Sequence, residues 1–150
     1  MRISANGLKK LMQWEGTILH IYKDAAGLPT IGTGHLIVKG EDFSAGITTE
    51  QAADLLQSDL MRFEDVVNSK VTVPLTQSQY DALVSFAFNV GVGAFRSSTL
   101  LKKLNAGDYD AIPEQLKRWN KAGGKVIDGL TYRRRNEIAL WNSENTEDIA

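Results

Sequence analysis

Residues 15–35 read EGTILHIYKDAAGLPTIGTGH, and within this run the sequence changes from a helical pattern to a strand pattern. Residues 18–22 are rich in branched and aromatic side chains, which favour a strand. Residues 24–27 are a turn signal, and residues 28–34 predict a second strand. The run therefore predicts a β-hairpin, and Pro29 places the second strand at a sheet edge.

The segments on both sides of this hairpin show helical patterns. Before it, a helix is predicted to begin after Ser4 and to end at Gly16. After it, capping boxes at Thr48 and Thr76 open two helices. The first is amphipathic and ends before Pro74, whereas the second is apolar on nearly every side and is predicted to be the central buried helix. Three shorter helices are predicted for residues 98–105, 109–119 and 130–141.

These elements predict an α+β fold that is mostly α, arranged as one domain of residues 1–142. A hairpin lobe covers about residues 15–47, a long connecting helix about 48–70, and a helical lobe about 71–142. The first helix is expected to pack with the helical lobe, and residues 143–150 form an acidic tail. A cleft between two lobes is a usual place for a substrate.

Composition narrows the class of protein. The chain has 150 residues, with 43% hydrophobic and 23% charged residues, as in an ordinary globular domain. It has no cysteine, which excludes disulfides and thiolate metal sites. No apolar run approaches the roughly 20 residues of a membrane span, so none is expected.

Charge is spread unevenly along the chain. The formal net charge of −1 argues against a dedicated nucleic-acid binder. Residues 96–135 nevertheless contain ten basic and four acidic residues, a local charge of +6. This pattern indicates either a solvated helical surface or a basic wall that faces an anionic polymer.

Glu15 carries the strongest chemical signal. It follows Leu8 by seven residues and Leu11 by four, so it lies on the apolar face of the first helix. It also stands in the last turn, at the negative end of the helix dipole. Both effects disfavour the ionised carboxylate, so we predict that Glu15 lies in a dry environment with a raised pKa. A carboxylic acid that is still protonated near neutral pH is what a general acid requires. A frayed helix end with Glu15 in solvent is the alternative.

Asp24 and Thr30 add a second carboxylate and a hydroxyl on the hairpin. Taken singly, Asp24 is equally a turn-former and Thr30 a strand residue. Paired carboxylates around a scissile bond are how most glycosidases work. Gly32 and Gly34 lack side chains on one face of the strand, which lets a bulky ligand approach, although simple hairpin twisting explains them as well.

The order and spacing of Glu15, Asp24 and residues 30–35 resemble the catalytic signature of the bacteriophage lysozymes, the endolysin family of the T-even and lambdoid phages. The likeness runs from about Leu8 to Trp141. Residues 47–52 resemble the entry to the family's long inter-lobe helix, and residues 85–91 resemble its central helix. Residues 118–119 resemble the start of its cleft-lining segment. Residues 123–130, followed by residues 133–135, resemble the lambdoid branch of the family.

The resemblance implies a lysozyme-like fold and a muramidase that cuts the β-1,4 bond between N-acetylmuramic acid and N-acetylglucosamine in peptidoglycan. Glu15 would be the general acid. Asp24, with Thr30, would position and activate a water on the opposite face of the sugar. The reaction would invert the anomeric centre, which predicts carboxyl groups about 6.5–9.5 Å apart. No metal or organic cofactor is expected. The implied substrate contacts are Gly34 and Leu36 on the hairpin lobe, and Phe88, Asn89, Arg118 and Trp119 on the helical lobe.

His35 and Asp59 are expected to form a pair. Asp59 falls on the apolar stripe of the long helix, where a carboxylate needs a partner. His35 ends the hairpin, and the family pattern pairs the two residues. Our hypothesis is a structural ion pair, not a catalytic one, that joins the hairpin to the long helix and raises the pKa of His35.

The resemblance also implies a biological setting, the lysis of a bacterial host at the end of phage infection. Residues 1–7 have no apolar signal core. We therefore expect an enzyme that waits in the host cytoplasm until a holin opens the membrane, and then acts on wall peptidoglycan. A monomer is also expected. The alternatives are a lytic transglycosylase, which uses one acid and no water, and an inactive glycan-binding module on the same fold. Selectivity between peptidoglycan and chitin stays open.

Overall fold

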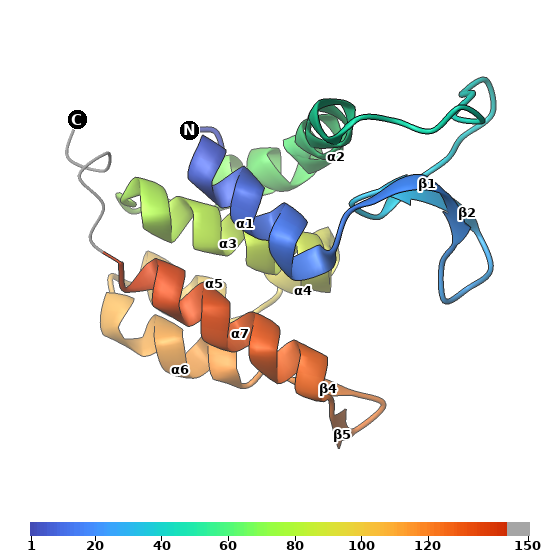
Figure 1. Cartoon of the computed structure of the whole chain (residues 1–150). Helices are drawn as coiled ribbons and strands as arrows, with labels where there is room; N and C mark the ends of the chain where they lie inside the picture. Colours follow the sequence, from blue (N-terminus) through green and yellow to red (C-terminus); the bar gives the residue numbers. More distant parts are fainter. Residues whose placement is uncertain (144–150) are drawn as a thin grey trace. The chain divides into compact units, whose positions relative to one another are not determined.

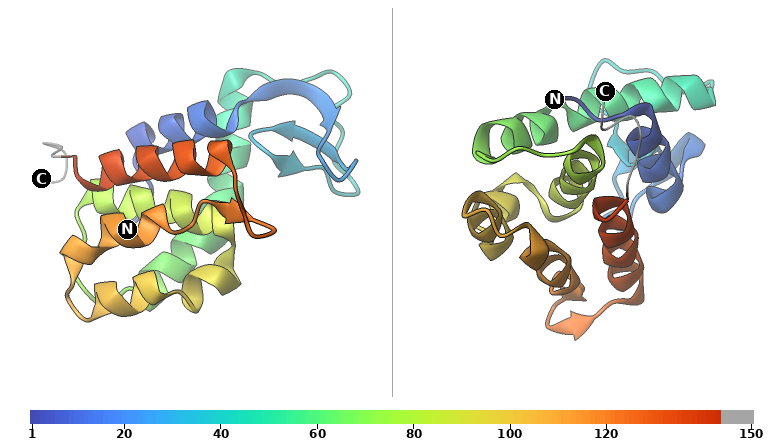
Figure 2. Two further views of the ribbon diagram at one scale, coloured as in Figure 1. Left: turned by 90° about the horizontal axis from the view of Figure 1, so that it is seen from below. Right: turned by 90° about the vertical axis from the view of Figure 1, so that its left-hand side faces the viewer.

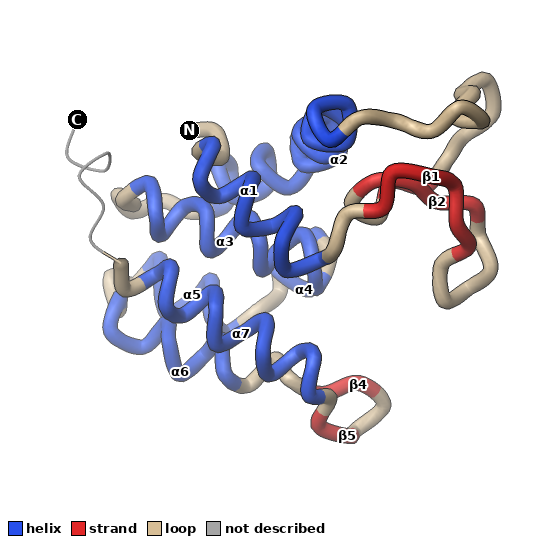
Figure 3. The backbone as a smooth tube through the Cα atoms, viewed as in Figure 1, coloured by secondary structure: helices blue, strands red, loops and turns tan. Residues whose placement is uncertain are grey.

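The structure is a computed structural model that describes residues 1–143, and the chain divides into two compact units. The sheet unit is Ala5–Met61, and the helical unit combines Met1–Ser4 with the chain from Arg62 onward. Strands occur in two places within the described residues, after the first helix and before the last (Figure 3). The predicted α+β class, mostly α, is confirmed. The predicted acidic tail lies outside the described residues, except for Ser143.

The sheet unit begins with helix α1 (Ala5–Glu15) and continues into three antiparallel strands (Figure 1). These strands are β1 (Ile18–Lys23), β2 (Pro29–Gly32) and β3 (His35–Leu36), in the order β1-β2-β3. The predicted hairpin is therefore present, with a third short strand added where the sequence indicated only its end.

The edge position predicted for the second strand is wrong, because β2 is the central strand. Pro29 is its first residue and stands opposite Lys23. A first residue tolerates proline because the missing N–H is not needed for the ladder. The Pro29 carbonyl still accepts a hydrogen bond from the Ile37 N–H at 3.0 Å. Proline therefore marks where the strand begins and not which side of the sheet it occupies.

The loop after β3 returns to the sheet before the long helix starts. The Ile47 N–H donates to the Leu19 carbonyl at 2.9 Å. Gly46 has a φ of +78°, and a Cβ there would lie 2.9 Å from the same carbonyl oxygen, so only glycine fits. The chain then enters α2 (Thr49–Lys70) through the predicted capping box between Thr48 and Gln51, which is confirmed.

The helical unit is built around α3 (Gln77–Val90), which a second capping box at Thr76 opens. Ser78 and all residues from Tyr80 to Ala87 are buried, which confirms the predicted central helix. Helix α7 (Asp128–Trp141) packs on both α3 and α6 (Figure 2). The remaining helical elements are α4 (Val92–Arg96), α5 (Thr99–Asn105), η1 (Tyr109–Ala111) and α6 (Ile112–Lys117).

A second hairpin, not predicted from the sequence, precedes α7. It consists of β4 (Lys121–Ala122) and β5 (Lys125–Val126). Gly123 and Gly124 form the turn, with φ values of +59° and +79°. Two positive φ angles in a two-residue connection suit the right-handed twist of a hairpin, and a Gly-Gly pair supplies them without strain. Within residues 1–143, none of the helices has the length and apolarity needed to cross a bilayer.

Met1–Ser4 belong to the helical unit through hydrogen bonds with distant residues. The Ile3 N–H donates to the buried Glu64 carboxylate at 2.8 Å, and the Ser4 N–H donates to Asp81 at 3.0 Å. The Gln77 amide donates to the Arg2 carbonyl at 2.8 Å. This N-terminal segment therefore closes against α2 and α3. The predicted packing of α1 on the helical lobe stays a prediction.

Candidate active site

Glu15 is the last residue of α1 and is exposed to solvent. The dry environment predicted for it is therefore wrong. The apolar stripe exists, since Leu11 is fully buried, but Leu8 and Met12 are only half-buried. Helical periodicity predicts on which face of the helix a side chain lies. It does not predict how far along the helix that face is buried by the rest of the protein. Burial of Glu15 therefore does not support the proposed proton-donor role.

Thr17 links the end of α1 to the sheet. Its hydroxyl donates to the Met12 carbonyl at 3.2 Å, which satisfies one of the carbonyls left open at the helix end. The same oxygen lies 3.0 Å from the hydroxyl of Thr33, which is buried between β2 and β3. The turn that carries Glu15 is thus tied to the sheet that carries Thr30. The sequence analysis missed this link because two threonines 16 residues apart give no local signal.

Asp24 uses one carboxylate oxygen to build its own turn. Its Oδ1 accepts hydrogen bonds from the N–H groups of Ala26 and Leu28, both at 2.9 Å. The Asp24 N–H in turn donates to the Leu28 carbonyl at 2.9 Å. The other oxygen, Oδ2, makes no hydrogen bond to any residue between 1 and 143. Asp24 is therefore both a turn-former and a fixed carboxylate with one oxygen available.

Thr30 is buried in the central strand, opposite Tyr22 on β1 and Leu36 on β3. Its hydroxyl donates to the Leu28 carbonyl at 2.9 Å. Since a hydroxyl has one proton and two lone pairs, the Thr30 oxygen can act only as an acceptor toward a further group. Leu28 thus holds both candidates, through its N–H for Asp24 and through its carbonyl for Thr30.

His35 lies between two carboxylates. Its Nδ1 is 2.8 Å from Asp59 Oδ2, and its Nε2 is 3.1 Å from both carboxylate oxygens of Glu41. Burial disfavours the charged imidazole, but the hydrogen bonds and charges of Asp59 and Glu41 together outweigh it and raise the pKa of His35. The hydrogen bond from the Val38 N–H lowers the pKa of Glu41, and the hydrogen bond with His35 lowers it further. Glu41 stands in a loop that carried no signal in the sequence.

This cluster predicts a defined pH dependence of unfolding. The contribution of His35 is complete below its ordinary pKa of 6.5 and is lost as pH rises through the raised value. The contribution of Glu41 is complete above 4.5 and is lost as pH falls through its lowered value. We expect Asp59→Asn to lower Tm by about 2–4 °C near pH 6, and by less at pH 8, as a calorimetric pH series would show.

Asp54→Asn is the matched control, because Asp54 is an exposed carboxylate on the same helix. It should leave Tm unchanged across the series. A deficit in Asp59→Asn that stays constant from pH 6 to pH 8 would rule out the ionic role of the pair.

The two glycines of the hairpin differ in their surroundings. Gly34 is exposed, and a Cβ placed there would meet open space, so the backbone is accessible to a ligand. Leu36 on β3 is also exposed. Gly32 is buried, and a Cβ there would contact Ile47 and Ala52. Gly34 therefore has space for a ligand, whose approach there stays a prediction, while at Gly32 the space is taken by Ile47 and Ala52.

The four remaining candidates belong to the helical unit. Phe88 is half-buried and packs edge-to-face on Phe63, with ring centroids 5.3 Å apart. Asn89 is exposed near the end of α3, and Arg118 is exposed directly after α6. Trp119 is half-buried and packs edge-to-face on Phe86 at 5.3 Å. Asn89 and Arg118 expose polar groups and Trp119 exposes part of its aromatic ring, and their contact with a substrate stays a prediction.

Comparison with known proteins adds independent evidence. A family model described as phage lysozyme matches residues 12–137. The endolysin of Salmonella phage P22 is 47% identical over 146 residues, which cover 95% of this chain and 99% of that protein. The endolysin of Bacillus phage PZA is 45% identical and spans the whole chain, but the chain spans only 58% of the PZA protein.

The fold also matches a solved structure. A crystal structure of a point mutant of P22 lysozyme superposes with a TM-score of 0.88 at 45% sequence identity. The match covers 95% of this chain and 99% of that chain. The sequence and structure comparisons therefore agree over almost the same residues.

Proposed function

The chain belongs to the phage lysozyme family, and on this basis we propose that it works as an inverting muramidase with Glu15 and Asp24 as its catalytic carboxyl groups. It is an endolysin, a glycoside hydrolase that degrades the peptidoglycan of a bacterial host. The bond cut, the stereochemistry and the roles of the residues are the proposal.

In the proposed reaction Glu15 donates its proton to the glycosidic oxygen as the bond to the anomeric carbon breaks. The departing sugar leaves as an alcohol, and the other develops oxocarbenium character. A water then attacks the anomeric carbon from the opposite face and transfers a proton to Asp24. Exposure of Glu15 at the end of α1 lets a polymeric substrate reach the acid.

The observation that supports water activation is the shared dependence of Asp24 and Thr30 on Leu28. Asp24 offers Oδ2, and Thr30 offers a hydroxyl oxygen whose proton is already donated to Leu28. Two acceptors can engage both protons of one water, which leaves its lone pair free to attack. A lytic transglycosylase has no use for such an arrangement, because it consumes no water.

The proposed substrate contacts are Gly34, Leu36, Phe88, Asn89, Arg118 and Trp119. We also propose that the enzyme is a monomer and reaches the wall after a holin has opened the host membrane.

Analysis of the products tests this proposal. Purified peptidoglycan is digested, and the new ends are identified by mass spectrometry and their anomeric form by NMR at early times. We expect reducing N-acetylmuramic acid with the α configuration. A 1,6-anhydro sugar would instead identify a lytic transglycosylase, a β product would exclude inversion, and binding without cleavage would identify an inactive module.

A further inference from the structure

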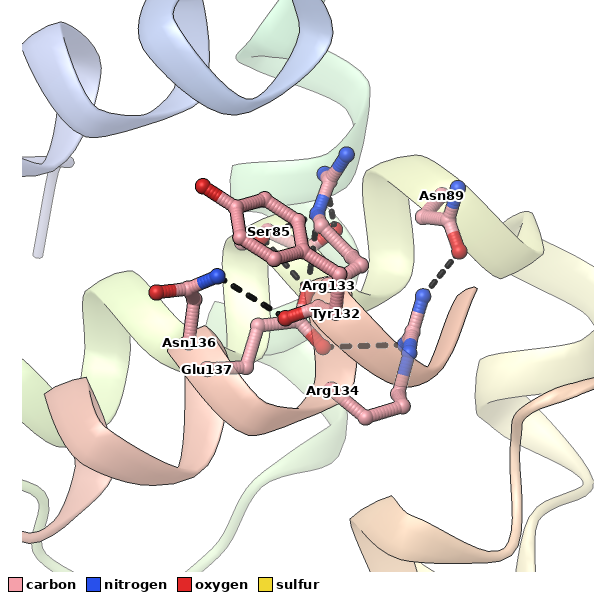
Figure 4. Close-up of polar contacts among 7 residues, drawn as sticks. All are labelled: Ser85, Asn89, Tyr132, Arg133, Arg134, Asn136 and Glu137. Carbon is pink, nitrogen blue, oxygen red and sulfur yellow. Dashed lines mark hydrogen bonds and ion pairs between the residues drawn. The ribbon is translucent and has the colours of Figure 1, made fainter. Parts of the chain in front are cut away.

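A buried ionic cluster joins α3 and α7 in the helical unit (Figure 4). We call Ser85, Arg133, Arg134 and Glu137 the Glu137 cluster, and each is at most 5% exposed. Glu137 Oε2 lies 3.2 Å from Arg133 Nε, and Glu137 Oε1 lies 2.9 Å from Arg134 Nη1. It also accepts a hydrogen bond from the Ser85 hydroxyl at 2.5 Å. One carboxylate therefore holds two buried guanidinium groups.

Stability alone does not account for such a cluster. Removing charges from water is costly, and a buried ion pair is often no more stabilising than apolar residues of the same volume. A fixed guanidinium, however, has five N–H donors in a rigid plane, so it can orient whatever group it touches.

Arg134 orients the side-chain amide of Asn89. An NH2 group of Arg134 donates to Asn89 Oδ1, and the two side chains face each other in Figure 4. Because a guanidinium only donates, the amide oxygen must face inward; the flipped amide would place two donors together. The Asn89 nitrogen makes no hydrogen bond within residues 1–143. Asn89 is exposed, so its N–H donors are available to a ligand.

The same guanidinium also supports Trp119. Arg134 lies over the Phe86 ring, with its central carbon 5.1 Å from the ring centroid. Phe86 in turn packs edge-to-face on Trp119. Arg134 therefore contacts Asn89 directly and Trp119 through one ring, and both residues are among the proposed substrate contacts.

We propose that Arg134, held in place by Glu137, is a positioning residue that presents Asn89 as a hydrogen-bond donor to the acetamido carbonyl oxygen of the glycan. This inference rests on the proposed function. A sugar hydroxyl can pair with a donor or an acceptor, whereas the acetamido carbonyl can only accept. De-N-acetylation leaves an ammonium group that can only donate, so a fixed donor favours the N-acetylated sugar over the de-N-acetylated one.

Asn89→Asp is the sharpest test. Aspartate keeps the oxygen that Arg134 binds and the shape of the side chain, but it replaces the outward donor with an acceptor. We expect KM for peptidoglycan to rise by about 10-fold with kcat within about 3-fold, because an unpaired or repelled carbonyl weakens binding. The preference for peptidoglycan over the same wall after chemical de-N-acetylation should fall by about 10-fold.

Arg134→Lys tests the positioning role. A lysine ammonium keeps the charge but lacks the planar fork that reaches Glu137 and Asn89 together. We expect a similar rise in KM, and the double variant with Asn89→Asp should be no more than about 2-fold worse than either single variant. Arg135→Lys is the control, since Arg135 is the exposed next residue of α7 and should change KM by less than 2-fold.

Full retention of the acetamido preference in Asn89→Asp would overturn the inference, as would additive effects in the double variant. If Arg134→Lys does not fold, the substrate comparison with Asn89→Asp still decides. The product analysis of the wild-type enzyme tests which bond is cut, so failure of the muramidase assignment and failure of this inference give different results.

Discussion

Glu15→Gln should reduce turnover of purified peptidoglycan by about 10²–10⁴-fold, the usual contribution of a positioned general acid. Glutamine has the same shape but cannot donate a proton to the glycosidic oxygen. Since Glu15 is exposed at the end of α1, the substitution removes the proton without creating a cavity. Release of reducing ends measures the effect, and circular dichroism and Tm verify the fold.

The control for this variant is Glu114→Gln, which removes an exposed carboxylate from the first turn of α6. Its activity should stay within about 2-fold of the parent, because surface substitutions away from a site rarely matter more. Near-normal lytic activity of Glu15→Gln would remove Glu15 from the mechanism and with it the proposed acid.

Asp24→Asn should reduce kcat by at least about 100-fold while leaving Tm almost unchanged. Asparagine retains Oδ1, which accepts from the N–H groups of Ala26 and Leu28, so the turn should persist. Only Oδ2 is replaced, by an NH2 group that cannot accept a proton from water. Initial rates on purified walls, compared with thermal unfolding, separate the loss of the base from loss of the turn.

Asp24→Ala supplies the contrast, because it removes the turn hydrogen bonds as well. It should be inactive and also less stable, by about 1 kcal/mol. An active Asp24→Asn beside an inactive Glu15→Gln would point to a mechanism with a single acid, as in a lytic transglycosylase.

Local signals in the sequence predicted the elements well. The capping boxes at Thr48 and Thr76 involve residues three apart, and both form as expected. The Gly123-Gly124 pair is an equally local signal, and it marks the second hairpin, which the helical patterns did not predict. The order of the strands was beyond such rules, since Pro29 suits both an edge and the first residue of a central strand.

The site was harder to predict where a side chain's burial or its contact with a residue distant in the sequence determines its environment. Periodicity placed Glu15 on the helix face of Leu11, but only the structure shows that Leu11 is buried while Glu15, one turn later, is exposed. Glu41 reaches His35 because the loop between them folds back, which composition does not reveal. Ser85 and Glu137 are 52 residues apart, so their buried contact leaves no pattern in either segment.

The N-terminal segment has a consequence for the order of folding. During synthesis, residues 1–4 emerge long before the groups they bind, since Ser4 must wait for Asp81, 77 residues later. The hydrogen bonds of the three-stranded sheet need nothing beyond Ile47, and those of His35 with Glu41 and Asp59 need nothing beyond Asp59. Contacts between distant residues form slowly because a long loop must close first. The start of the chain is therefore among the last parts to reach its native place on the nascent polypeptide.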